Sequence, residues 1–179
     1  MQNAPVSFLV LVLAMSGCRG IPNRVQPEEY NVYSAWLGKR PVKHPPPGNL
    51  YISFRTMIYN ATEECGKQLR PLLKSDAGLA DQLSALGEAQ YPLDLYSTPP
   101  KLKVPMPFKP LGDYPSQEPN RPYRLITFSR VAFNTAGTVA LFAVSGSCGG
   151  LCGGGGALIA RRDNAGVWAF EDTGCVWVY

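Results

Sequence analysis

The chain has 179 residues, of which 45% are hydrophobic, and a formal charge of +4 from 17 basic and 13 acidic side chains. This length suits one domain with an N-terminal extension, and the hydrophobic fraction excludes a chain that is disordered throughout. The basic residues form no dense stripe interleaved with aromatic residues, which argues against a nucleic-acid partner. We interpret the positive excess as part of a solvated surface.

The N-terminus carries a short, mostly apolar run over residues 6–15, followed by Ser16, Gly17 and Cys18. A membrane-spanning helix needs roughly 20 apolar residues, so this run is too short to span and fits the core of a signal peptide instead. The run with its small residues and cysteine resembles the bacterial lipobox, whose cysteine receives diacylglycerol. The sequence therefore predicts a signal peptide and a lipidated Cys18. The alternative is a buried N-terminal strand with a core cysteine.

These features divide the chain into a signal peptide over 1–17, a lipidated cysteine with a tether over 18–26, and a single domain over 27–179. Several acyl chains on one cysteine give stable membrane anchoring. In the lipoprotein pattern, Asp directly after the lipidated cysteine is associated with retention in the inner membrane. Arg19 stands at that position here, so the sequence favours the outer membrane. We expect an exported protein anchored in the bacterial cell envelope.

The first element of the domain is a helix that begins at Pro27 and ends near Leu37. Proline in the first turn, acidic residues behind it and basic residues after the end are typical of a helix. Tyr30, Tyr33 and Trp36 recur with Leu37 at helical spacing and form one apolar face. We expect this face to be part of the core, with a ligand platform as the alternative.

Between this helix and the C-terminal third, the sequence predicts a strand over 50–58 and short helices over 62–73 and 79–89. From 92 to 122 the frequent prolines exclude long regular structure. We expect this stretch to wrap around the surface of the domain.

Five strands are predicted in the C-terminal third, over 125–133, 139–144, 157–162, 167–170 and 175–179. Short turns between neighbouring strands indicate an antiparallel meander. The second strand is apolar on both faces, so a layer must cover each face, and the first helix is the expected cover for one. The predicted fold is α+β, with the N-terminal helix and irregular segments packed on a curled antiparallel sheet of four to five strands.

Several segments recur in the same order in one family: EEYNVYSAWL, SRVAFNTAGTVALFAV, CGGLCGGGGALI, GVWAF and WVY. On these segments the chain resembles a family of uncharacterised secreted bacterial proteins and lipoproteins. Ser129, Arg130, Val131, Phe133 and Asn134 match its first strand segment. The resemblance covers the C-terminal third and, less closely, the first helix. It implies the same fold and a secreted setting, and it implies no activity.

Apart from Cys18, the chain has four cysteines: Cys65, Cys148, Cys152 and Cys175. An even number in an exported chain predicts two disulfides, and three pairings are possible. We favour Cys148–Cys152 and Cys65–Cys175, because glycines around the first pair allow so short a ring. The alternative is a four-thiolate zinc site, although the C-x3-C spacing departs from the usual C-x2-C. Export favours oxidation, so no metal is predicted.

The glycine run 153–156 is the second motif of this region. A phosphate-binding loop needs Gly-Lys-Ser/Thr at the start of a helix, whereas this run leads into a strand with no lysine nearby. We interpret the run as a flexible or bulged hairpin, and we expect no cofactor.

Candidate catalytic residues are few. The only histidine, His44, lies in a proline-rich segment with nothing beside it to orient its ring, so we expect His44→Ala to change little. The acidic pairs 28–29 and 63–64 are neighbours in the sequence, and neighbours on a helix do not face each other. Arg130 and Asn134 are polar residues beside an apolar strand and are candidate ligand-binding residues. For Arg130 the alternative is a structural role in a salt bridge.

Together these observations favour a non-catalytic envelope lipoprotein that binds a partner or a small ligand. The alternative is an envelope hydrolase whose site is assembled from residues distant in the sequence. A pocket of apolar side chains with few titratable groups would favour the first function. A cleft that gathers two carboxylates, or His44 with an acid, would favour the second.

Overall fold

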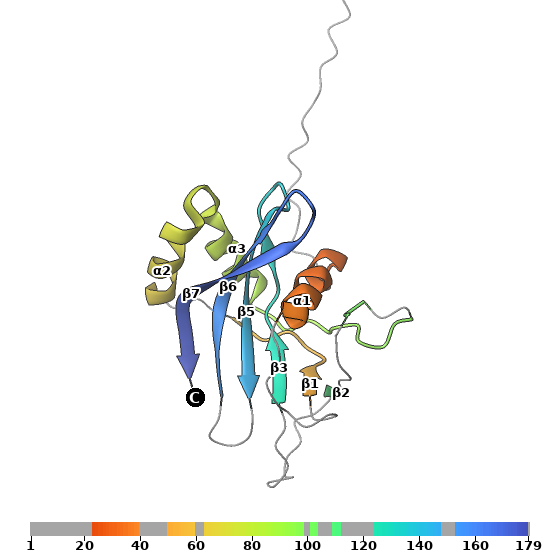
Figure 1. The fold of residues 1–179 in the computed structure, drawn as a ribbon. Helices are drawn as coiled ribbons and strands as arrows, with labels where there is room; N and C mark the ends of the chain where they lie inside the picture. The colour runs from red at the N-terminus through yellow and green to blue at the C-terminus, as the bar shows by residue number, and fades with distance from the viewer. Residues whose placement is uncertain are drawn as a thin grey trace, which may run out of the picture.

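The fold is seen in a computed structural model, which describes residues 23–39, 50–59, 63–98, 101–103, 109–111, 124–147 and 153–178 (Figure 1). Its helices are α1 (Pro27–Lys39), α2 (Glu63–Leu73) and α3 (Gly78–Leu86), with a 3₁₀ turn at Lys74–Asp76. Its strands are β1 (Leu50–Ser53), β2 (Lys109–Leu111), β3 (Arg124–Phe128), β4 (Ala132–Phe133), β5 (Val139–Ser147), β6 (Gly153–Arg162) and β7 (Trp168–Val178). The fold is α+β, as the sequence predicts.

The sheet has the strand order β2-β1-β3-β5-β6-β7, and β4 pairs with β5 beside β3. Strands β3, β5, β6 and β7 form the predicted antiparallel meander, but β1 pairs in parallel with both β2 and β3. The expectation of a curled, purely antiparallel sheet of four to five strands is therefore wrong in two respects. The sheet is mixed and larger, and it is not strongly curled (Figure 1). Parallel neighbours need a long crossover, and α2 and α3 lie between β1 and β3 in the chain.

Several predicted strand boundaries also differ: the strand predicted over 50–58 ends at Ser53, and the one predicted over 139–144 extends to Ser147. The segment predicted as one strand over 125–133 is broken between β3 and β4, and the two last predicted strands form the single strand β7. The glycine run 153–156 is the first part of β6, not a loop. At Gly155 a Cβ would overlap the Trp177 indole and the Val144 carbonyl, so the missing side chain lets the indole lie on the strand.

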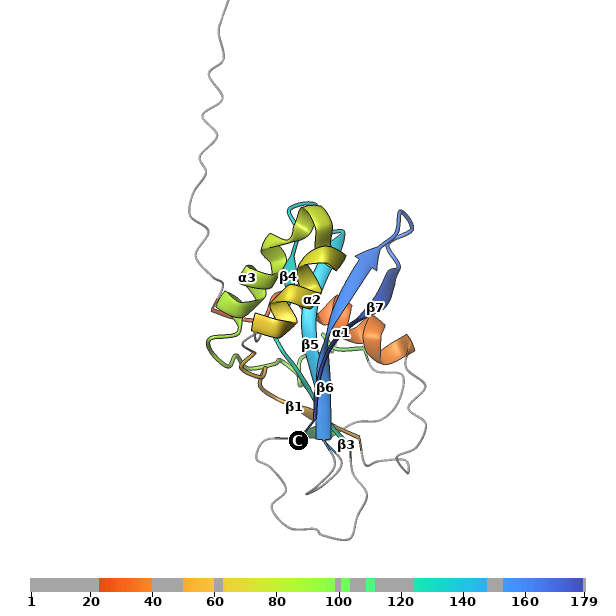
Figure 2. The same ribbon diagram turned by 90° about the vertical axis from the view of Figure 1, so that its left-hand side faces the viewer.

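Helices cover both faces of the sheet (Figure 2). On one face, α1 packs against the buried side chains Ala140, Phe142 and Val144 of β5. On the other face, α2 and α3 pack against Val139, Leu141 and Ala143 of the same strand. This arrangement confirms the prediction that β5 is covered on each face and that the N-terminal helix covers one of them. Each face therefore has its own hydrophobic core.

A disulfide between Cys65 and Cys175 joins α2 to β7 across the second core. This is the longer of the two pairings favoured from the sequence, whereas Cys148 and Cys152 lie outside the described residues. The Tyr59 hydroxyl lies 3.2 Å from the Cys65 sulfur and 3.5 Å from the Cys175 sulfur. Burial raises the pKa of Tyr59 to about 12.

Candidate functional site

The break between β3 and β4 positions Arg130. The Ser129 backbone N–H donates to the Ala143 carbonyl at 2.9 Å, while the Ser129 hydroxyl accepts the Ala143 N–H at 2.8 Å. The same hydroxyl donates to the Arg130 carbonyl at 2.6 Å. The Ser129 side chain thus accepts a β5 backbone N–H that a strand carbonyl would accept in a regular sheet. The backbone leaves the strand conformation at this point. The departure directs Arg130 toward α1.

Arg130 forms a buried ion pair with Glu29 of α1, and each residue is only 1% exposed. The guanidinium donates from Nε to both carboxylate oxygens, at 3.1 and 2.9 Å, and from Nη2 to Oε1 at 2.8 Å. The backbone N–H groups of Gln26 and Val131 also donate to the carboxylate, at 2.9 and 2.8 Å. Paired and hydrogen-bonded in this way, the carboxylate fixes the start of α1 to the sheet.

Aromatic rings surround this pair. The guanidinium carbon of Arg130 lies 4.6 Å from the centre of the Tyr91 ring. The Tyr33 hydroxyl donates to the Ser129 carbonyl at 2.6 Å, and burial raises the pKa of Tyr33 well above its usual value. The sequence makes Arg130 a candidate ligand-binding residue. The structure places it inside the core, where its contacts are those of the salt-bridged structural residue considered as the alternative.

Asn134 lies in the turn between β4 and β5. Its side-chain oxygen accepts the N–H groups of Thr138 at 2.9 Å and Val139 at 3.1 Å, and its amide nitrogen donates to Asp76 at 3.3 Å. Gly137 completes the turn with a φ of +66°, which a glycine adopts at little cost. Asn134 therefore organises the turn. Neither of the two candidate residues from the sequence lines the cleft described next.

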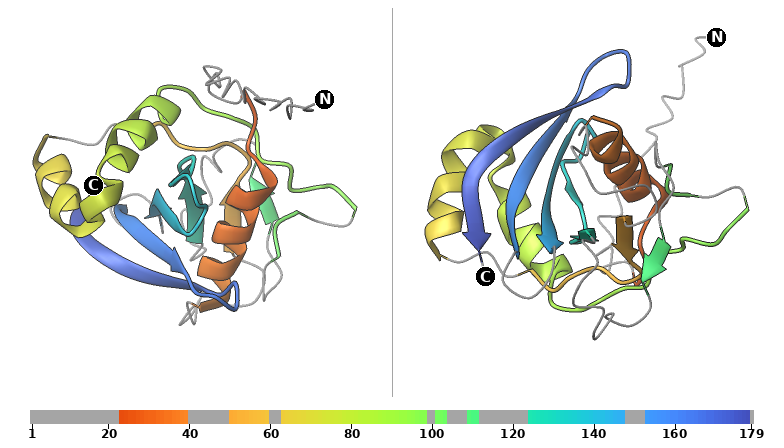
Figure 3. Two further views of the ribbon diagram at one scale, coloured as in Figure 1. Left: turned by 90° about the horizontal axis from the view of Figure 1, so that it is seen from above. Right: turned by 60° about the horizontal axis from the view of Figure 1, so that its bottom comes forward.

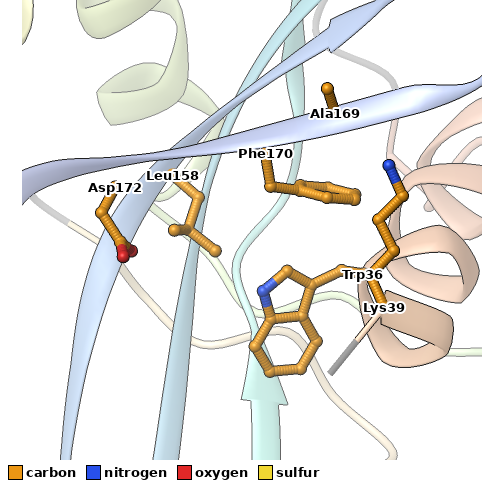
Figure 4. Close-up of a pocket in the computed structure, with 6 residues that line it drawn as sticks. All are labelled: Trp36, Lys39, Leu158, Ala169, Phe170 and Asp172. Atoms are coloured by element: carbon orange, nitrogen blue, oxygen red, sulfur yellow. The ribbon is translucent and has the colours of Figure 1, made fainter. Parts of the chain in front are cut away.

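A cleft of about 380 Å³ opens between α1 and the β6–β7 hairpin (Figure 4). We call it the α1–β7 cleft, and its lining residues are Trp36, Lys39, Leu158, Ala169, Phe170 and Asp172. Its volume is within the range of roughly 300–1,000 Å³ that is usual for small-molecule sites.

Local geometry explains why these side chains meet. Trp36 and Lys39 are three residues apart on α1 and share one face of the helix. Phe170 and Asp172 are two residues apart on β7 and share one face of the strand, and Leu158 of β6 is the direct cross-strand neighbour of Asp172. The Trp36 and Phe170 rings frame the cleft, and Leu158 lies between the indole and Asp172 (Figure 4).

Two charged groups stand on opposite sides of this apolar space (Figure 4). The Lys39 ammonium donates to the Trp168 carbonyl and lies 5.7 Å from the centre of the Phe170 ring. An ammonium has three N–H donors, so this contact holds the group in place without exhausting its donors. Asp172 is at the other side, on an exposed part of β7. The cleft thus combines an aromatic slot with a fixed cation.

Sequence reasoning found part of this site. The sequence predicts that the face of α1 carrying Trp36 is part of the core, with a ligand platform as the alternative. Lys39 and Phe170 were missed, because nothing in the sequence shows that a residue at the end of α1 meets a strand more than 100 residues later. The other residues considered from the sequence, Cys18, His44, Cys148 and Cys152, lie outside the described residues.

The described part of the chain contains no group of three or more His, Cys, Asp or Glu side chains placed to hold a metal ion. Among the same residues, no helix is long and apolar enough to cross a membrane. Comparison with protein-family models, with curated proteins and with solved structures finds no match to this chain.

Proposed function

We propose that this chain is a cell-envelope lipoprotein whose folded domain is a non-catalytic module that binds a small ligand in the α1–β7 cleft. The observation that carries this proposal is the cleft itself, with Trp36, Leu158 and Phe170 around an apolar space and the Lys39 ammonium held at its side. Concave sites with mostly apolar walls and a few placed polar groups are typical of small-molecule binding. The ligand that fits has a flat apolar body and an anionic or hydrogen-bond-accepting group.

The same geometry favours binding over the hydrolase alternative. Glycoside hydrolysis usually needs a pair of carboxylates that flank the reacting bond, and the lining of the α1–β7 cleft supplies one carboxylate, that of Asp172. The buried Glu29 carboxylate faces Arg130 and backbone N–H groups inside the core, not the cleft. These contacts hold the start of α1 against the sheet.

Binding to the cleft can be tested with anilinonaphthalene sulfonate, a fluorescent probe with a flat aromatic body and an anionic group. We expect the folded chain to bind it and increase its emission. Phe170→Ala removes one wall of the slot, and Lys39→Met removes the cation. Each change is expected to weaken binding about fivefold, since an aromatic contact or a partly buried charge pair contributes on the order of 1 kcal/mol.

The matched control is Tyr96→Ala, which removes an exposed aromatic side chain that does not line the cleft. This variant should bind the probe as the unchanged chain does. Near-ultraviolet circular dichroism must show that each variant stays folded, because the probe also binds loosely packed states. Unchanged binding by folded Phe170→Ala and Lys39→Met would contradict the proposed site.

The membrane anchor is the second part of the proposal. The lipobox-like segment ending at Cys18 motivates it, and the Cys65–Cys175 disulfide supports an oxidising compartment. In a bacterial host we expect the mature N-terminus to be Cys18 carrying acyl chains, and Cys18→Ser to release the chain from the membrane fraction. Mass spectrometry of the N-terminal peptide measures this. An unmodified Cys18 thiol, or cleavage at another residue, would refute lipidation.

A further inference from the structure

The α1–β7 cleft carries charges of opposite sign on its two sides. Helix α1 lies beside the β6–β7 hairpin, and the cleft opens between them (Figure 3). The Lys39 ammonium stands on one side of the apolar space and the Asp172 carboxylate on the other (Figure 4). An anionic group bound at Lys39 leaves this carboxylate unused, so Asp172 is a second charged group that a ligand can meet.

The regular part of β7 sets the distance between the two charges. The Lys39 ammonium donates to the carbonyl of Trp168, which lies four residues before Asp172 on the strand. Residues 168–172 pair without a break with residues 158–162 of β6. A strand rises about 3.3 Å per residue, so these four residues span about 13 Å. The two groups are therefore too far apart to pair with each other, and a ligand that reaches both is on the order of 10 Å long.

Apolar side chains line the interval between the charges. Phe170 is midway between Trp168 and Asp172 on β7, and alternate residues of a strand share one face. Leu158 is the cross-strand neighbour of Asp172, and the Trp36 indole lies across the space from Phe170 (Figure 4). Because the walls between the charges are aromatic or aliphatic, a flat apolar body fits this interval best.

We propose, on the basis of the binding site inferred above, that the ligand of the α1–β7 cleft is amphoteric. Its anionic group binds the Lys39 ammonium, its cationic amine or guanidine group binds the Asp172 carboxylate, and a flat apolar body joins the two. Charges of opposite sign also fix the direction in which the ligand binds, because reversal would bring like charges together on both sides. A ligand that is only anionic meets one of the two charges.

Two biphenyl compounds of matched shape test the cationic group. Both carry a carboxylate at the para position of one ring. The other ring carries a para aminomethyl group in the first compound and a para ethyl group in the second, so that they differ only in the ammonium. Isothermal titration calorimetry uses the full chain with Cys18→Ser, so that no acyl chain takes up the compounds. We expect the aminomethyl compound to bind about threefold more tightly, as is usual for an ion pair at an exposed site.

Variants of the same chain assign the preference to one carboxylate. Asp172→Asn keeps the size of the side chain and removes its charge, so the preference for the aminomethyl compound should disappear. Lys39→Met should weaken both compounds alike, because both carry the carboxylate. The matched control is Glu171→Gln, which changes the neighbouring acid on the other face of β7, where it pairs with Arg161 at 3.1 Å. This control should leave the preference unchanged.

The outcomes distinguish the ligand class from the binding site. Equal binding of the two compounds that still weakens with Phe170→Ala and Lys39→Met overturns the amphoteric ligand and leaves the site in place. A preference that Asp172→Asn does not change also overturns the amphoteric ligand. If neither compound binds, or if folded Phe170→Ala binds both as the unchanged chain does, the site and the ligand class are both wrong.

Discussion

Arg130→Met is expected to lower the free energy of unfolding by about 3–5 kcal/mol, because it leaves a buried carboxylate without its cation. The Glu29 carboxylate is 1% exposed, and Arg130 donates to both of its oxygens. After the substitution the carboxylate keeps the N–H groups of Gln26 and Val131 but loses the opposite charge. Chemical denaturation monitored by circular dichroism measures the change.

Two further variants show whether the loss comes from the unpaired charge. Arg70→Met removes an exposed arginine of α2 and should stay within about 0.5 kcal/mol of the unchanged chain. Adding Glu29→Leu to Arg130→Met removes both charges and should recover much of the lost stability, since buried pairs are often replaceable by apolar side chains. A loss below about 1 kcal/mol for Arg130→Met, within the range of an ordinary hydrogen bond, would contradict the structural role of the pair.

The second large effect is expected at the Cys65–Cys175 disulfide, whose cysteines are 110 residues apart in the sequence. Cross-linking so distant residues restricts the unfolded chain, and the loop-entropy relation gives about 5 kcal/mol of stabilisation for a loop of this length. Replacing both cysteines with alanine should therefore remove most of that stability. The midpoint of thermal unfolding under non-reducing conditions measures it.

The comparison for this experiment is the pair Cys148 and Cys152. A disulfide between them would close a ring so short that the same relation gives only about 2 kcal/mol. Replacing this pair with alanine should therefore cost less than half as much as replacing Cys65 and Cys175. An equal loss for both pairs, or a negligible loss for the long one, would contradict this assignment of stability.

The predictions from sequence succeeded where the signal is local. Helix α1 has its proline, its acidic first turn and its apolar face within 13 residues, so its limits and its buried side were predictable. The turns from β4 to β5 and from β6 to β7 are marked by Asn and Gly, and strands β5, β6 and β7 form the predicted antiparallel meander. In these segments, periodicity and turn chemistry act over a few residues and outweigh the influence of distant parts of the chain.

The predictions were wrong or incomplete where structure depends on distant partners. Glu29 looks like an ordinary residue of a helix N-terminus, and only the fold shows that its carboxylate meets an arginine 101 residues later. Glycine disfavours strands locally, yet the run 153–156 pairs with β5 and β7 on both sides. Strands β1 and β3 pair in parallel although α2, α3 and β2 separate them in the chain, so neither strand's own sequence indicates its partner. The α1–β7 cleft was unpredictable for the same reason.

The long disulfide also has a consequence for how the chain matures. In the proposed export from the N-terminus, Cys18 emerges first and is the site of lipidation, followed by Cys65, then Cys148 and Cys152, and Cys175 last. The native partner of Cys65 is thus the final one to arrive, and the earlier thiols compete for it. Errors made in that interval are corrected by thiol–disulfide exchange, which takes seconds to hours and is accelerated by isomerases. We therefore expect oxidative maturation to be limited by disulfide reshuffling, with the order of emergence setting which mispairings form first.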